Sequence, residues 1–87
     1  MVSLDGKEFL DKDSSYEYLN QELDFDYYVK NLDALYDGLT MVDCDIEIIN
    51  YRDIYTNLDE YGKSMLGVFL DASLNDYINL NLKTFGD

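Results

Sequence analysis

Residues 27–40, with the sequence YYVKNLDALYDGLT, combine two side-chain patterns in one short segment. The first pattern is apolar: Leu32, Leu35 and Leu39 recur at the i, i+3 and i+7 spacing of a helix face that packs into a core. Asn31 precedes the first leucine and is a favourable N-cap, because its side chain can accept a hydrogen bond from a free backbone N–H. The segment therefore predicts a short amphipathic helix that begins after Asn31.

The second pattern is a stripe of acidic, aromatic and hydroxyl side chains on another face of this helix. Asp33, Tyr36, Asp37 and Thr40 follow the i, i+3, i+4 and i+7 spacing. The two aspartates form a like-charged pair that costs an isolated helix about 0.2–0.5 kcal/mol, and after Lys30 the segment contains no base. Carboxylates beside an aromatic side chain, on a helix whose leucines already serve the core, indicate an interface. A solvated acidic surface is the plainer interpretation of the same spacing, and both stay open at this point.

Outside this segment, alternating apolar residues predict three strands, and the helical spacing predicts two further helices. The strands are expected at about 1–5, 44–50 and 77–83, and the helices at about 14–24 and 56–75. Ser14 and Glu17 have the spacing of a capping box at the first of these helices, and Thr56 with Asp59 resembles a second one. Gly62 is expected to divide a first turn or two from the longer helix.

The element order β-α-α-β-α-β predicts the fold class. Strands separated by helical crossovers pair in parallel, so we expect an α/β fold with a small three-stranded parallel sheet and helices packed on it. Tyr16, Leu19 and Leu23 mark the buried face of the first helix. Ile49 points to the opposite side of the middle strand from its other apolar residues, which predicts a sheet covered at least partly on both faces. At 87 residues, the chain is expected to form a single domain, 1–87.

The amino-acid composition of the chain excludes several classes of function. Nineteen acidic residues against six basic ones give a formal net charge of −13, which repels nucleic acid and anionic lipid and attracts a basic partner, or serves solubility alone. The absence of histidine excludes Ser-His-Asp and Cys-His catalysis and any ordinary zinc site. A chain this short has little room for a substrate cleft, so we expect neither an enzyme nor a cofactor.

Cellular location follows from the N-terminus and the cysteine content. The start MVSLDGKEF lacks the basic and apolar regions of a secretory signal, and no run of about 18 apolar residues could span a membrane. The lone Cys44 cannot form an internal disulfide, which fits a reducing compartment and a structural thiol. We expect the protein to be cytoplasmic.

The segment YYVKNLDALYDGLT closely resembles the barstar family, whose corresponding pattern reads approximately Tyr-Tyr-Gly-x-Asn-Leu-Asp-Ala-Leu-x-Asp-x-Leu. The resemblance extends more loosely over the whole chain, through the segments LDGKEF, MLGVFLDA and INLNL. Members of this family are small intracellular inhibitors of secreted bacterial ribonucleases of the barnase kind. The resemblance therefore implies a barstar-like fold, a basic ribonuclease as partner and no catalytic site of its own.

The family's inhibitory surface is an acidic helix with the loop before it, and the resemblance implies one role for each matching position. Asp37 would occupy the place of an RNA phosphate in the nuclease, and Asp33 would meet a second basic cluster. Tyr27 would pack against the catalytic histidine of the enzyme. The remaining implied contacts are Tyr36, which stands where the founding member has tryptophan, Thr40 at the helix end, and Asp71 on the later helix. The chain departs from the family pattern at Val29, which replaces a glycine, at Lys30, which adds a positive charge, and at Asn75, where an acid would help binding.

Other functions remain compatible with the residues. Asp43, Asp45 and Glu47, or alternatively the stretch 71–75, have some of the oxygen ligands of a calcium loop but lack its glycine. A nucleic-acid mimic that blocks a DNA-binding protein would use the same charges, as would an immunity protein against another toxin nuclease. A hydrolase that uses two carboxylates is a fourth alternative. The free protein is expected to be a monomer, since like charges oppose self-association.

Overall fold

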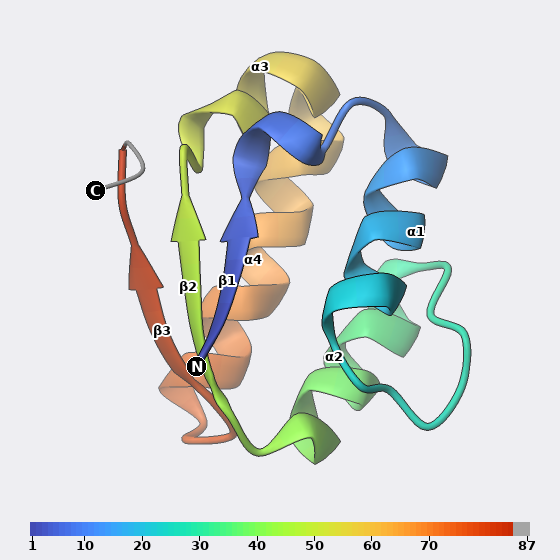
Figure 1. The fold of residues 1–87 in the computed structure, drawn as a ribbon, viewed down its shortest axis with the longest axis vertical. Coiled ribbons are helices and arrows are strands. Elements are labelled where there is room, and N and C mark those ends of the chain that lie inside the picture. Colours follow the sequence, from blue (N-terminus) through green and yellow to red (C-terminus); the bar gives the residue numbers. More distant parts are fainter. Residues whose placement is uncertain (85–87) are drawn as a thin grey trace.

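The computed structural model describes residues 1–84 and contains one parallel three-stranded sheet with strand order β1-β2-β3 (Figure 1). Four α-helices and one 3-10 turn complete the described chain. The elements are β1 (Val2–Asp5), η1 (Gly6–Glu8), α1 (Lys12–Glu22), α2 (Leu32–Val42), β2 (Asp45–Ile49), α3 (Arg52–Leu58), α4 (Glu60–Leu74) and β3 (Asn79–Leu82). The predicted α/β class, the parallel sheet and the order β-α-α-β-α-β are confirmed.

One face of the sheet carries the core and the other face is polar. In the observed register Leu4 lies beside Ile48, and Ile48 beside Leu82, on the face covered by helices. In Figure 1, α4 runs behind β1 and β2, while α1 and α2 lie beyond the β1 edge. On the other face Ile49 is half-buried among polar neighbours, and the described chain forms no second helical layer there. The second face of the sheet, which we predicted to be at least partly covered, is covered only to the extent that Ile49 is half-buried.

The capping of α1 differs from the prediction. Asp11, not Ser14, is the N-cap, because its Oδ1 accepts a hydrogen bond from the Ser14 backbone N–H at 2.8 Å. The helix consequently begins at Lys12, two residues earlier than expected, and the predicted capping box with Glu17 is wrong. Several residues of this segment could cap a helix, and sequence alone does not select among them. The predicted buried face is confirmed, since Tyr16, Leu19 and Leu23 are all buried.

The last helical segment is divided at Asp59 and not at Gly62. Asp59 has a backbone φ of 54° and ends α3, after which α4 begins at Glu60. Thr56 donates its hydroxyl to the Arg52 carbonyl inside α3, so the predicted capping box of Thr56 and Asp59 is also wrong. Gly62 lies inside α4, where a Cβ atom would come within 2.3 Å of the Ile54 carbonyl oxygen. Its role is to let α3 and α4 approach each other closely.

Helix α2 forms as the leucine spacing predicts. Asn31 is the N-cap, and its Oδ1 accepts a hydrogen bond from the Ala34 backbone N–H at 2.8 Å. Leu35 and Leu39 are fully buried and pack into the same core as the sheet and α4, while Leu32 is half-buried. The helix ends at Asp43, which adopts a left-handed conformation. Packing of these leucines fixes the orientation of α2 relative to the rest of the molecule.

Within residues 1–84, no helix has both the length and the apolar content needed to cross a lipid bilayer.

Candidate partner-binding site

The stripe of Asp33, Tyr36, Asp37 and Thr40 lies on the side of α2 next to its buried leucines, and we call it the acidic face. Asp33 and Asp37 are exposed, whereas Tyr36 and Thr40 are half-buried at its margin. The Thr40 hydroxyl donates to the backbone carbonyl of Asp37 at 2.6 Å, so this bond leaves the Asp37 carboxylate free. Among residues 1–84, neither aspartate carboxylate takes part in a hydrogen bond or an ion pair. The face therefore presents two uncompensated negative charges to solvent.

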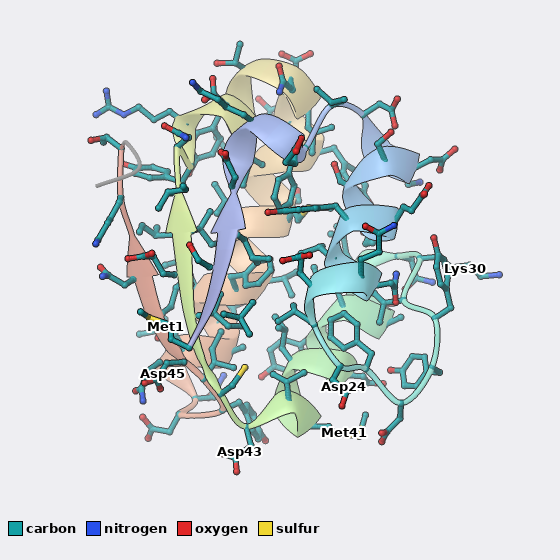
Figure 2. All side chains as sticks on the ribbon, in the orientation of Figure 1. Met1, Asp24, Lys30, Met41, Asp43 and Asp45 are labelled. Atoms are coloured by element: carbon teal, nitrogen blue, oxygen red, sulfur yellow. The ribbon has the colours of Figure 1, made fainter. Side chains whose placement is uncertain are left out.

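Basic side chains of the same chain do not neutralise these charges. The one ion pair within the described residues joins Lys83 Nζ to Glu47 Oε1 at 2.8 Å, on the outer face of the sheet. Lys30, the base nearest in sequence to the acidic face, is exposed and projects from the loop before α2 (Figure 2). It reaches neither aspartate within ion-pair distance. The aspartates are available to a partner.

The structure brings Asp71 of α4 close to Tyr36 of α2 through a residue between them. Asn75 Nδ2 donates to the Tyr36 hydroxyl at 3.2 Å and to the Asp71 backbone carbonyl at 2.9 Å. The ring of Tyr77 meets that of Tyr36 edge to face, with centroids 6.2 Å apart. Asp71 itself is exposed. The acidic face thus continues from α2 onto the C-terminal end of α4.

The loop of residues 23–31, between α1 and α2, borders the acidic face on its other side. Tyr27 and Tyr28 are 42% and 60% exposed. The Tyr27 hydroxyl donates to the Ala34 carbonyl at 3.3 Å, which places Tyr27 beside the first turn of α2. All six residues expected at the site therefore lie on α2, on the loop before it or on the adjoining end of α4.

Two further residues at this site were not found from the sequence. Tyr77 packs against Tyr36, and Asn20 of α1 binds the backbone of the loop before α2. Each lies in a different element from its partner, so no local spacing marks the pair. Asn75 was noted only as a position without an acid, and its contact with Tyr36 spans 39 residues of sequence.

A small polar cavity next to the C-terminal end of α2 carries no catalytic arrangement. It has a volume of about 110 Å³ and is lined by residues 43–45 and 76–79. Partial burial raises the pKa of the Cys44 thiol, and the carboxylates of Asp45 and Asp43 act in the same direction, so the reactive thiolate is disfavoured. In residues 1–84 there is no group of three or more histidine, cysteine or carboxylate side chains that could hold a metal ion.

The fold and the acidic face together define a class of protein: a small α/β scaffold that holds exposed acidic side chains on a packed helix. Residues 1–79 match the family model described as Barstar (barnase inhibitor). The chain is also 36% identical over 75 residues, 82% of each chain, to the Bacillus subtilis (strain 168) protein named "Putative ribonuclease inhibitor YrdF". The chain belongs to the barstar family, and the resemblance found in the sequence is confirmed.

Proposed function

We propose that the protein inhibits a ribonuclease by inserting the acidic face and the loop before it into the basic active site of that enzyme. The family description and the name of the Bacillus relative both point to an inhibitor and not to an enzyme. The observation that carries the mechanism is the exposure of Asp33 and Asp37 on a rigidly packed helix, with no cation of residues 1–84 paired to them.

The chemistry of a nuclease site explains why carboxylates would block it. Such a site holds phosphates with arginine, lysine and often histidine side chains, whose N–H groups are fixed in place. Asp37 would accept those hydrogen bonds at a phosphate position, and Asp33 would do so at a neighbouring cluster. Because a carboxylate offers no phosphodiester bond, the enzyme would be occupied without reacting.

Side chains around the two aspartates would complete the contact. Tyr27 would pack against the catalytic histidine of the enzyme, where an aromatic ring adds apolar contact area beside charged groups. Tyr36 and Thr40 would contact the rim of the active site, and Asp71 would meet a peripheral base. Tyr36 and Thr40 share α2 with the two aspartates, whereas Tyr27 comes from the loop before it and Asp71 from α4.

Net charge would add speed to the association. A chain of net charge −13 attracts a basic enzyme over distances longer than a side-chain contact. Salt screens this attraction, so the association rate constant should fall as ionic strength rises. We place this encounter in the cytoplasm, with the inhibitor monomeric before it binds.

The role of Asp37 is tested by a pair of substitutions that change the net charge equally. Asp37→Asn and Glu60→Gln each remove one exposed carboxylate, and Glu60 begins α4 outside the acidic face. With barnase as the probe enzyme, we expect Asp37→Asn to raise the inhibition constant far more than Glu60→Gln, mainly through faster dissociation. Equal inhibition constants for the two variants would remove Asp37 from its role.

A binding screen separates the remaining functions. The protein would be immobilised and exposed to barnase, to unrelated toxin nucleases and to DNA-binding proteins, at low and at high salt. Stoichiometric inhibition of RNA cleavage supports the proposal. Capture of another toxin nuclease would favour an immunity protein against that enzyme, and capture of a DNA-binding protein alone would favour a nucleic-acid mimic.

A further inference from the structure

The side chain of Asn20 joins α1 to the loop of residues 23–31 through both ends of its amide group. Asn20 Oδ1 accepts a hydrogen bond from the Val29 backbone N–H at 2.8 Å, and Asn20 Nδ2 donates to the Val29 carbonyl at 2.6 Å. The same Nδ2 also donates to the Tyr16 carbonyl, one helical turn back, at 2.7 Å. The Asn20 amide group thus pairs with both the N–H and the C=O of Val29, as a neighbouring β-strand would, and it is also hydrogen-bonded to its own helix.

Two apolar side chains hold the loop against α2 as well. Val29 is fully buried, although it stands at the position where the family pattern has glycine. The ring of Phe25 covers Gly38 of α2 so closely that a Cβ there would lie 2.5 Å from Phe25 Cδ1 and 3.3 Å from Val29 Cγ2. The loop is therefore attached to both helices that flank it. We call Asn20, Phe25 and Val29 the loop latch.

The loop latch determines which side chains the loop exposes. Val29 is buried, whereas its two neighbours in the chain, Tyr28 and Lys30, are both exposed. Tyr27, one residue further, is held beside α2 by its hydrogen bond to the Ala34 carbonyl.

We infer that Asn20 is a positioning residue, which holds residues 23–31 in one conformation in the free protein so that Tyr27 and Tyr28 are presented beside the acidic face before the enzyme arrives. A loop that is already ordered loses less conformational entropy on binding, and this raises affinity without any new contact. The part of the inference that concerns binding rests on the proposed ribonuclease inhibition. The part that concerns the loop is a property of the free chain.

The free protein provides the first test, by amide hydrogen exchange of Asn20→Ala and of a matched control, Tyr18→Phe. Tyr18 also lies on α1, and its hydroxyl accepts a hydrogen bond from the Asp5 backbone N–H at 2.8 Å, away from the loop. We expect the Val29 amide to exchange about tenfold faster in Asn20→Ala than in wild type, and to be unchanged in Tyr18→Phe. Unchanged protection of Val29 in Asn20→Ala would overturn the inference.

Inhibition of barnase by the same variants provides the second test. Asn20→Ala should raise the inhibition constant by about three- to tenfold, and Tyr18→Phe should leave it unchanged at a temperature where both are folded. Equal losses in the two variants would show that Asn20 acts through global stability alone and would refute its positioning role.

If Asn20→Ala does not fold, Val29→Gly provides a second variant with which to test the loop latch. This variant removes the buried side chain but keeps both backbone hydrogen bonds, and it should also expose the loop to exchange and weaken inhibition. A protein that does not inhibit barnase in its wild-type form would contradict the proposed function for that enzyme, and the exchange data would still decide whether the loop latch operates.

Discussion

Replacing a glycine of α4 by alanine is expected to have opposite effects on stability at its two positions, Gly62 and Gly67. Gly62 faces α3 at a distance where a Cβ atom would lie 2.3 Å from the Ile54 carbonyl oxygen and 2.9 Å from its carbonyl carbon. Gly67, further along the same helix, has no heavy atom within 4 Å of the equivalent position. Alanine at 62 therefore adds a collision that alanine at 67 does not.

The magnitudes follow from helix propensity and from packing. Either alanine gains about 1 kcal/mol over glycine in a helix interior, so Gly67→Ala should raise the melting temperature by about 4–8 °C. At Gly62 the same gain is opposed by overpacking, which costs about 1–3 kcal/mol. We take the upper end because the obstructing atoms belong to the backbone and cannot turn aside as a side chain would. Gly62→Ala should then be destabilised by about 2 kcal/mol, a fall of about 8–16 °C.

Thermal unfolding followed by circular dichroism would measure both variants, and inhibition of barnase would be measured well below both transitions. We expect inhibition to be unchanged in each, because neither glycine lies on the acidic face. A Gly62→Ala protein as stable as Gly67→Ala would refute the close approach of α3 and α4. Lost inhibition in a folded Gly62→Ala protein would show that this helix contact also controls the binding surface.

Three further predictions concern a cap, an ion pair and the edge of the site. Asp11→Ala should lower the melting temperature because Asp11 caps α1, whereas Ser14→Ala should change it little; equal decreases would contradict this assignment of the cap. The Lys83 ammonium holds the pKa of Glu47 below its ordinary value of 4.5. When the pKa of a carboxyl group is lower in the folded state than in the unfolded state, the group stabilises the folded state at any pH above its unfolded-state pKa. This stabilisation is lost as the pH falls through the folded-state pKa. The stability difference between wild type and Lys83→Met in chemical denaturation should therefore be present at neutral pH and absent in strongly acidic solution, and a pH-independent difference would refute the linkage. Asn75→Ala removes the hydrogen bond between α4 and the acidic face and should raise the barnase inhibition constant about two- to fivefold; an unchanged constant would mean that this contact does not support binding.

The spacing of apolar residues in the sequence was sufficient to predict those helices and strands in which such residues repeat regularly. The spacing of Leu35 and Leu39 predicted both the position of α2 and the exposure of its aspartates, because the helical period determines which residues share the buried face and which do not. The strands were found for the same reason, since alternation puts Ile46 and Ile48 on the buried face. Exposure of Asp33 followed from its place outside the leucine face of the helix.

Features set by contacts between elements were not predictable in this way. Asp59 ends α3 with a positive φ of 54°, whereas the sequence favoured a break at Gly62 because glycine is the commoner helix breaker. In the fold, Gly62 is required by the closeness of a neighbouring helix, which spacing does not reveal. Asn20 resembles any other polar helix residue until the loop packs beside it. The contacts proposed for the acidic face with an enzyme come from the family resemblance and stay predictions.

The separation of the two faces of α2 has a consequence for protein engineering. Since neither the Asp33 nor the Asp37 carboxylate forms a hydrogen bond or an ion pair in the described chain, their replacement removes a repulsion between like charges and leaves the leucine packing intact. A randomised library at these two positions should therefore yield mostly folded variants, from which binders of other cationic proteins could be selected. Under the proposed function, recognition and folding depend on different residues of this helix, so that the first could be changed while the second is kept.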